Sequence, residues 1–310
     1  MKFLVTGGCG FIGGHLVRAL VQAGNEATIL DVDVSPSDAH PTPGVEIVHG
    51  SVVDRSTLAR AVRDCAGIFH LAALSTVAEC EADPNLCRET NVGGTEEVLL
   101  AARQQGGIPV VYASSAAVYG EHAERHSRER DQTDPLSFYA KSKVDVENLA
   151  CSAFDAFGQR SVGLRFFNVY GPSAIGREPR GVVAKFVAKA LADESVTIFG
   201  DGEQVRDFVA VSDAVRHLLA AMKLDRKGAA VLNVCTGVGT SINSLVDIIR
   251  EVGGRPLRVV REPAMQADIH HSVGDPTFAN ELLNLGGAVP FRSGIENVAA
   301  ALCAECPTVE

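Results

Sequence analysis

The sequence lacks any run of apolar residues long enough to cross a membrane, which takes roughly 20 of them in succession. Its first apolar residues, Phe3-Leu4-Val5, are interrupted by Thr6-Gly7-Gly8, after which an amphipathic helical pattern begins. This order is typical of a first β-strand rather than of a secretory signal. We therefore expect no membrane partner and a cytoplasmic location.

The chain also lacks an excess of positive charge. Its 28 Lys and Arg residues are outnumbered by 38 Asp and Glu residues, which gives a formal net charge of -10. Nucleic acids and acidic membrane surfaces are bound through concentrated Lys and Arg. The composition therefore argues against nucleic-acid partners, although a few well-placed arginines are enough to bind a small anionic ligand.

Cysteine is too scarce for a disulfide scaffold, because there are eight cysteines among 310 residues. Cys303 and Cys306 form a single C-x-x-C pair, which without a second pair is weak evidence for zinc. Four others fall within predicted core elements, where a thiol packs like a small apolar group: Cys9, Cys65, Cys151 and Cys235. We predict no metal site.

The first half of the chain alternates short β-branched runs with longer stretches whose apolar residues have helical spacing. The runs predict strands that are apolar on both faces, at residues 3–6, 27–30, 45–48, 67–70, 110–113 and 162–165. The intervening stretches predict helices at residues 11–23, 54–62, 85–105 and 138–157. Buried strands that alternate with helices are typical of a parallel sheet covered on both sides. The sequence therefore predicts a doubly wound α/β fold.

The alternation changes after Gly171-Pro172, where turn-forming residues become more frequent. A helix is predicted at residues 182–191 and a strand at 196–199, and alternation resumes from Val209 to Val234. We predict one domain from residues 1–171, to which residues 207–239 return. Residues 172–206 and 240–310 are predicted to form a smaller second lobe.

A glycine-rich turn joins the first predicted strand to the first helix. In T-G-G-C-G-F-I-G, Gly7 permits a tight turn, Gly10 lets the backbone approach a pyrophosphate, and Gly13 lets helix and strand pack closely. The helix then presents its N–H groups to the anion. Its place after a strand, before a helix, makes this pattern more specific than a bare glycine triplet.

Asp31 ends the second predicted strand, near the spacing at which a carboxylate binds the ribose of NAD. Such a carboxylate repels the 2′-phosphate of NADP, and no Arg or Lys follows it through Pro43. NAD is therefore the favoured cofactor. The alternative is a turn-forming Asp in Asp31-Val32-Asp33.

A second group of polar residues is expected at the same edge of the sheet. Tyr139 and Lys143 are four residues apart on one helix face, where the ammonium favours the phenolate and lets the tyrosine act as a base. Asn91, in another predicted helix, could hold Lys143 in place. Ser114 and Ser115 follow a strand whose carboxyl end points to the same crevice. The alternative is a Tyr/Lys pair without function on a surface helix.

Several motifs together resemble the nucleotide-sugar epimerases and dehydratases of the extended short-chain dehydrogenase/reductase family. They extend from the N-terminus almost to the end of the chain: TGGCGFIGGHL, HLAAL, NVGGT, SSAAVYG, YAKSK, RFFNVYGP and GDGEQVRDFV. The resemblance implies a Rossmann domain that binds NAD and a smaller lobe that binds a nucleotide sugar. Relatives often form homodimers through the helices equivalent to residues 85–105 and 138–157, and we expect a homodimer here.

The resemblance also implies roles for individual residues. Ser115, Tyr139 and Lys143 are expected to be catalytic. Substrate contacts are expected from Ser115, Tyr139, Asn168, Val182, Arg206 and Ser272. Cofactor contacts are expected from Gly7, Gly10, Phe11, Ile12, Gly13, Asp31, Asp54, Leu71, Ala72, Ala73, Asn91, Ser114, Tyr139, Lys143 and Phe166.

The residues after Ser115 favour one reaction within this group. Dehydratases resembling it place acidic residues there, and decarboxylases a Glu, whereas this chain has Ala116 and Ala117. The expected activity is therefore a 4-epimerase of a UDP-hexose or UDP-N-acetylhexosamine, acting by C4 oxidation and hydride return. Alternatives are an NAD-linked 4-keto reductase or dehydrogenase, and a non-catalytic NAD-binding regulatory protein.

Two positions depart from related epimerases. Met265 occupies the place of an Arg that helps bind the diphosphate, so Arg206 has less help unless His270 or Arg261 substitutes. Ser272 stands where some epimerases carry a bulky residue beside the sugar, and its small side chain would leave room for an N-acetyl group. Adjacent His270 and His271 point to opposite faces of an extended segment, which argues against a metal site.

Overall fold

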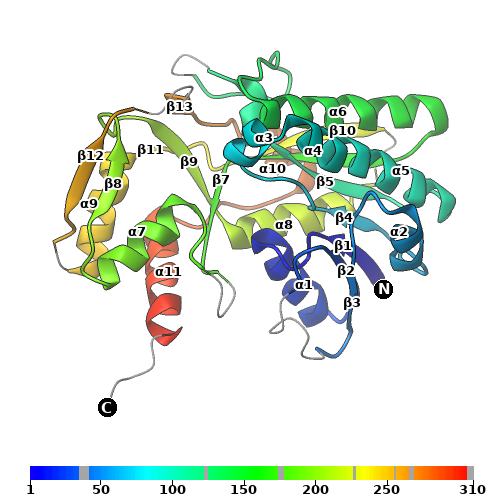
Figure 1. Ribbon diagram of the computed structural model, residues 1–310, viewed down its shortest axis with the longest axis horizontal. Coiled ribbons are helices and arrows are strands. Elements are labelled where there is room, and N and C mark those ends of the chain that lie inside the picture. Colours follow the sequence, from blue (N-terminus) through cyan, green and yellow to red (C-terminus); the bar gives the residue numbers. More distant parts are fainter. Residues whose placement is uncertain are drawn as a thin grey trace.

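The computed structural model describes residues 1–34, 42–121, 125–173, 178–225, 228–254, 256–264 and 269–305. These residues form a large lobe around a central sheet and a smaller lobe beside it (Figure 1). Met265 and Cys306, two positions singled out in the sequence, lie outside the described residues. Within the described part of the chain, no helix is both long and apolar enough to cross a membrane.

The central sheet has seven strands in the order β10, β6, β5, β4, β1, β2, β3, and every neighbouring pair is parallel. The strands are β1 (Lys2–Thr6), β2 (Glu26–Asp31), β3 (Val45–His49), β4 (Ile68–His70), β5 (Val110–Ser115), β6 (Ser161–Phe166) and β10 (Ala229–Val234). The order reverses at β1, as in a doubly wound sheet. The predicted fold class is confirmed.

Alternate residues of the strands point into two separate cores. Phe3 and Val5 of β1 pack with α1 (Phe11–Gln22) and α8 (Val211–Met222). Leu4, between them, packs on the opposite face with α2 (Arg55–Ala61), α5 (Gly94–Gln104) and α6 (Phe138–Phe157). Figure 1 shows α1 and α8 on one side of the sheet and α5 and α6 on the other. Burial on both faces explains why these strands are almost continuously apolar.

The helix predicted at residues 85–105 is present and contains a π-helical turn. It consists of α4 (Pro84–Arg88), a π-helical turn at Glu89–Gly93 and α5. An additional helix, α3 (Val77–Ala82), precedes it and was not predicted. Its start is fixed by a capping box, in which Thr76 and Glu79 each bind the other's backbone N–H, a signal that is readable in the sequence as T-x-x-E.

The smaller lobe contains two short sheets. β9 (Val205–Ala210) pairs with β7 (Asn168–Tyr170), β11 (Gly239–Ser241) and β13 (His271–Ser272), while β8 (Val196–Phe199) pairs with β12 (Val259–Glu262). The helices of this lobe are α7 (Gly181–Leu191), α9 (Ile242–Gly253) and α11 (Phe291–Glu305), whereas α10 (Thr277–Leu283) packs against β10. A cluster of three rings, Tyr170, Phe208 and Phe291, fastens α11 to the sheet.

Candidate active site

The glycine turn between β1 and α1 is packed too closely for side chains. Gly7 has a φ of 69°, and a Cβ there would lie 2.7 Å from the backbone nitrogen of Ala72. A Cβ on Gly13 would lie 2.1 Å from the carbonyl oxygen of Gly7. Gly10 is the N-cap of α1, and no side chain of the described residues caps this helix. The first turn therefore offers backbone N–H groups to an anion, with Phe11 and Ile12 next to Gly10.

Asp31, at the carboxyl end of β2, lies beside this turn. One of its carboxylate oxygens accepts a hydrogen bond from the backbone N–H of Cys9 at 2.9 Å, and the other accepts one from Asp33 at 3.0 Å. The second bond is the Asx turn that the sequence allowed as the alternative. The first places the carboxylate at the glycine turn, where a ribose next to a bound pyrophosphate would lie. The cradle and the carboxylate together fit NAD.

Other predicted cofactor residues surround the same turn. The backbone of Leu71 and Ala72, just after β4, contacts Gly7, and the N–H of Ala72 donates to the hydroxyl of Thr6 at 3.3 Å. Ala73 follows directly in the chain. Asp54 is the N-cap of α2, where hydrogen bonds from Thr57 and Ser56 lower its pKa to about 2. Asp54 thus already has a structural role on an exposed helix end.

The three predicted catalytic residues meet at the junction of β5 and α6. Ser115 is the last residue of β5, while Tyr139 and Lys143 lie one turn apart at the start of α6, whose N-cap is Ser137. The ammonium nitrogen of Lys143 donates to the carbonyl oxygen of Ala113 at 2.9 Å and lies 5.7 Å from the centre of the Tyr139 ring. The hydroxyl groups of Tyr139 and Ser115 lie close to each other.

The electrostatics differ from the sequence-based expectation that Lys143 lowers the pKa of Tyr139. Burial raises the pKa of Tyr139, and the nearby hydroxyl of Ser115 opposes this effect. Burial also lowers the pKa of Lys143, to about 8, with Glu147 acting in the opposite direction. Spacing alone gives the proximity of the two groups, but the cost of desolvating each charge depends on how deeply the fold buries them.

The sequence suggested that Asn91 helps to hold Lys143 in place. Asn91 does so through the helix next to Lys143 and not by binding its ammonium group. It lies buried in the π-helical turn, where its side-chain amide exchanges hydrogen bonds with the backbone of Leu74 and donates to the hydroxyl of Ser142 at 3.0 Å. Ser142 precedes Lys143 on α6. The amide oxygen and the amide nitrogen of Asn91 both bind the backbone of Leu74. Asn91 therefore fixes the helix beside Lys143 and does not bind the ammonium group.

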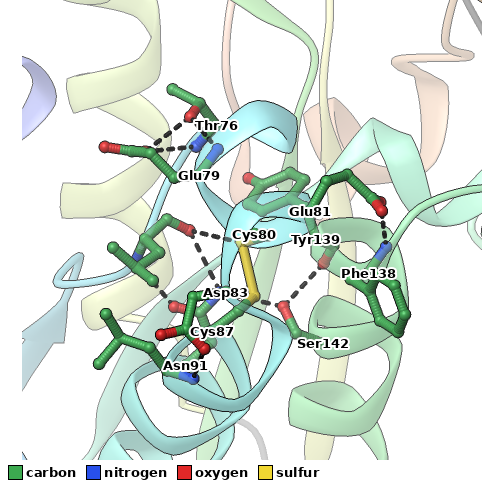
Figure 2. The surroundings of a disulfide bond; sticks show 12 residues. Thr76, Glu79, Cys80, Glu81, Asp83, Cys87, Asn91, Phe138, Tyr139 and Ser142 are labelled. Carbon is green, nitrogen blue, oxygen red and sulfur yellow. Dashed lines mark hydrogen bonds between the residues drawn. A yellow bond between two sulfur atoms is a disulfide. The ribbon is translucent and has the colours of Figure 1, made fainter. Parts of the chain in front are cut away.

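A disulfide that the sequence analysis missed supports this region. It joins Cys80 of α3 to Cys87 of α4, with a Cα–Cα distance of 5.1 Å (Figure 2). The Nδ2 of Asn91 donates to the sulfur of Cys87. On the other side, the carboxylate of Glu81 in α3 accepts a hydrogen bond from the backbone N–H of Phe138 at 2.9 Å. The cross-linked segment therefore contacts α6 on both sides of Tyr139.

Three of the four cysteines predicted to be core residues, Cys9, Cys65 and Cys235, are buried. The fourth prediction was wrong, because Cys151 is exposed on α6. A long helix that covers a sheet has one face turned to solvent, and a free cysteine on it is not always on the buried face.

The predicted substrate residues gather on the small sheet and on the first turn of α7. Arg206 of β9 is paired in register with Ser272 of β13, and Asn168 of β7 is paired with Phe208, two residues beyond Arg206. Val182 lies at the start of α7, and Phe166 ends β6, two residues before Asn168.

The proposed replacements for the missing arginine are also in defined positions. Arg261 donates to the carbonyl oxygen of Asp201 at 2.6 Å and to the side chain of Asn243 at 3.1 Å. The backbone N–H groups of His270 and His271 donate to the carboxylate of Glu121. Glu121 follows the S-S-A-A-V-Y-G motif, so it joins β13, and with it Ser272, to the segment after β5.

Comparison with known protein families now identifies the chain. Residues 3–235 match the model of the NAD dependent epimerase/dehydratase family. The chain belongs to this family. It is therefore an NAD-binding protein of the nucleotide-sugar epimerase and dehydratase group, as the motifs and the glycine cradle indicate.

Individual relatives match almost end to end. A putative UDP-glucose 4-epimerase of Methanocaldococcus jannaschii is 34% identical over 95% of this chain and 96% of its own length. A UDP-N-acetyl-alpha-D-glucosaminuronate decarboxylase of Bacillus cytotoxicus is 31% identical, over 84% and 83% of the two chains.

The solved structures show the same range. UDP-glucose 4-epimerase of Thermotoga maritima with UDP-glucose superposes with a TM-score of 0.91, at 30% identity and 98% and 99% coverage of the two chains. MoeE5 in complex with UDP-glucuronic acid and NAD gives a TM-score of 0.89, at 32% identity and 99% and 100% coverage. The fold is therefore shared by proteins that bind different UDP-sugars.

The glycine cradle gives a first prediction. Gly13→Ala would place a methyl group against the carbonyl oxygen of Gly7, so we expect NAD affinity to fall at least about tenfold and stability by roughly 1–3 kcal/mol. Calorimetric titration with NAD⁺ measures the affinity. Gly14→Ala is the matched control, because a Cβ there meets only the carbonyl oxygen of Gly8, at 3.8 Å. Equal affinities of the two variants would contradict the prediction.

The disulfide gives a second prediction. The bridge closes a loop with a sequence separation of 7 residues, so replacing both Cys80 and Cys87 by Ser should lower the free energy of unfolding by about 2 kcal/mol under non-reducing conditions. Denaturant unfolding measures this difference, with Cys151→Ser as the control. A thiol reductant should bring the wild-type protein to the level of the double variant, and an unchanged difference would argue against a disulfide in solution.

Proposed function

We propose that the chain is an NAD-dependent 4-epimerase of a UDP-hexose or UDP-N-acetylhexosamine. The main support for this proposal is that Ser115, Tyr139 and Lys143 lie together at the junction of β5 and α6. Ser115 is followed in the chain by Ala116 and Ala117. The three polar residues supply what reversible oxidation of an alcohol needs. The two alanines supply no further acid or base for eliminating water.

In this reaction Tyr139 removes the proton of the sugar C4 hydroxyl, which Ser115 holds by a hydrogen bond. NAD, when bound, accepts the hydride from C4 and returns it. Lys143 keeps positive charge close to the phenolate as it forms. When the hydride comes back to the opposite face of the 4-keto sugar, Tyr139 returns the proton. No net oxidation results, so the cofactor stays on the protein.

The smaller lobe has to hold the nucleotide while the 4-keto sugar rotates to present its opposite face. Arg206 on β9 supplies a positive charge for the diphosphate, and Asn168 on the neighbouring strand supplies amide donors. Ser272, in register with Arg206, is placed beside the sugar in this proposal. Its small side chain favours acceptance of a 2-acetamido group.

Three other assignments are tested by the same assays. The decarboxylase relative and the bound UDP-glucuronic acid of MoeE5 make an acidic sugar a substrate to include. An NAD-linked 4-keto reductase would release its cofactor at each turnover. A non-catalytic NAD-binding protein would bind the nucleotide sugar without altering it, and Met265 in place of an arginine is the feature that favours it.

We also propose a homodimer in the cytoplasm. Leu99 of α5 and Val146 of α6 are buried in the chain's own core, so they are covered without a partner. A dimer through these two helices would have to use their outward faces. Leu100 is partly buried, whereas Leu149 packs against the chain's own core. Sedimentation of the purified protein distinguishes a dimer from a monomer.

The third prediction tests the reaction. We expect inversion at C4 of UDP-glucose or UDP-N-acetylglucosamine, followed by proton NMR, without added NAD⁺. Tyr139→Phe should slow it by at least about 100-fold, because it removes the proton-transferring group. Tyr170→Phe is the control, since the Tyr170 hydroxyl is buried and no described residue binds it. Inversion at a normal rate in Tyr139→Phe would refute the proposed mechanism, and decarboxylation of UDP-glucuronate would refute the epimerase.

The fourth prediction concerns the choice of sugar. Ser272→Tyr should depress turnover of UDP-N-acetylglucosamine at least about tenfold more than turnover of UDP-glucose, because the ring would fill the space proposed for the acetamido group. The ratio of kcat/KM for the two substrates measures this effect and corrects for any general loss of activity. An equal loss on both substrates would contradict it.

A further inference from the structure

A buried carboxylate that the proposed mechanism does not use lies one turn beyond Lys143. Glu147 faces inward from α6 and is almost fully buried. Its two carboxylate oxygens accept a bidentate pair of hydrogen bonds from Arg165 of β6, at 2.9 and 2.7 Å. The hydroxyl of Ser114 on β5 donates to one of the same oxygens. One side chain therefore joins α6 to two strands of the central sheet.

The cation that pairs with Glu147 is itself enclosed. Arg165 is buried, and its remaining Nη donates to the backbone carbonyl of Glu129 at 3.3 Å. Its guanidinium group lies 4.7 Å from the centre of the Tyr119 ring, and the Tyr119 hydroxyl donates to the side chain of Asn233. The ion pair is thus enclosed on the side away from α6, and Lys143 lies one turn earlier on the same helix.

Glu147 and Lys143 hold consecutive residues of the same strand. Lys143 binds the carbonyl oxygen of Ala113, and Glu147 binds the hydroxyl of Ser114. The next residue is Ser115, which meets Tyr139. Two side chains one helical turn apart therefore fix the end of β5 against α6 and set where Ser115 stands relative to Tyr139.

The charged and titratable groups around Lys143 come from three elements. Glu147 and Tyr139 lie on α6 itself, Arg165 on β6 stands behind Glu147, and His70 on β4 faces the ammonium. Burial lowers the pKa of His70 to about 3, so His70 is neutral and gives Lys143 no countercharge. The carboxylate of Glu147 opposes the effect of burial on the pKa of Lys143.

We propose that Glu147 is a positioning residue whose negative charge keeps Lys143 protonated beside Tyr139 and whose hydrogen bonds hold the end of β5. The proposal rests on the assignment of Tyr139 and Lys143 as the catalytic pair. Its charge component goes beyond packing. An amide of the same shape could still accept hydrogen bonds from the Nε of Arg165 and from Ser114 at its single oxygen, but its NH2 group would face the second Arg165 donor and it would not attract the ammonium.

The charge role can be tested without substrate by titrating Lys143 itself. The chain has seven lysines, so the signals of isotope-labelled lysine side chains can be followed individually by NMR. Burial lowers the pKa of Lys143 to about 8, and Glu147 opposes this effect. Lys143→Arg removes one lysine signal and so assigns it.

The fifth prediction compares three variants by this titration, over the pH range in which circular dichroism shows the fold intact. Glu147→Gln should lower the pKa of Lys143 by about one unit, the scale set by one charge at i,i+4 spacing and an effective dielectric constant of about 20. Glu147→Asp keeps the charge and should leave the pKa of Lys143 in place.

Glu129→Gln is the matched control, because it removes a half-buried carboxylate that binds the backbone of Asn233. It should also leave the pKa of Lys143 in place. An unchanged pKa of Lys143 in Glu147→Gln, or the same decrease in Glu147→Asp, would overturn the charge role.

If Glu147→Gln does not fold, Arg165→Gln carries the test. Glu147 would then act on Lys143 without a neighbouring cation, and the pKa of Lys143 should rise. An unchanged or lower value would overturn the proposal. Since no substrate is turned over in either titration, a failure of the 4-epimerase assignment would show in the NMR assay and not here.

Discussion

The parallel pairing of the central strands determines where the chemical groups of this protein can meet. Thr6 of β1 is in register with Leu30 of β2 and with His70 of β4, and Ser115 of β5 is in register with Phe166 of β6. Because all these strands end at the same edge of the sheet, the residues that follow them form one continuous strip. The glycine turn, Asp31, Ala72, Ser115 and Asn168 are neighbours for this reason, although up to 161 positions separate them in the chain.

The residues along this edge keep their relative positions only if the covering helices are fixed against the sheet. Buried polar groups provide this. The ring nitrogens of His70 lie 2.8 Å from the hydroxyl of Thr6 and 3.1 Å from that of Thr95, which joins β1 and β4 to α5. Glu147 and Arg165 do the same for α6, β5 and β6. A half-satisfied buried group is costly, so these contacts favour one position of each helix over its alternatives.

Periodicity and motif spacing were sufficient for the fold and for the approximate location of the candidate site. The doubly wound sheet follows from apolar strands between helices, and Gly7, Asp31, Ser115 and Tyr139 follow from where each lies relative to a strand or helix end. The π-helical turn at Glu89–Gly93 could not be predicted, because continuous helical spacing extends across it. The Cys80–Cys87 bridge depends on the angle between α3 and α4, which no spacing rule gives.

Electrostatics was the part least accessible from sequence. The Tyr-x-x-x-Lys pattern gives two groups on one helix face, but their ionisation depends on desolvation and on partners such as Ser115 and Glu147 from elsewhere on α6 and the sheet. Glu147 carried no signal of its own, because a glutamate one turn after a lysine is common on exposed helices. Only the register of β6 against β5 brings Arg165 beside it.

The same reasoning extends to the smaller lobe, where Asp207 determines the position of Arg206. Asp207 is fully buried, and its carboxylate accepts hydrogen bonds from Thr236, Gly237 and Gly274. It therefore holds β9 against the segment after β10 and the segment after β13, and this fixes the pairing of Arg206 with Ser272. In the proposed function, the charge that Arg206 offers to a diphosphate and the space beside Ser272 therefore both depend on the one buried carboxylate of Asp207.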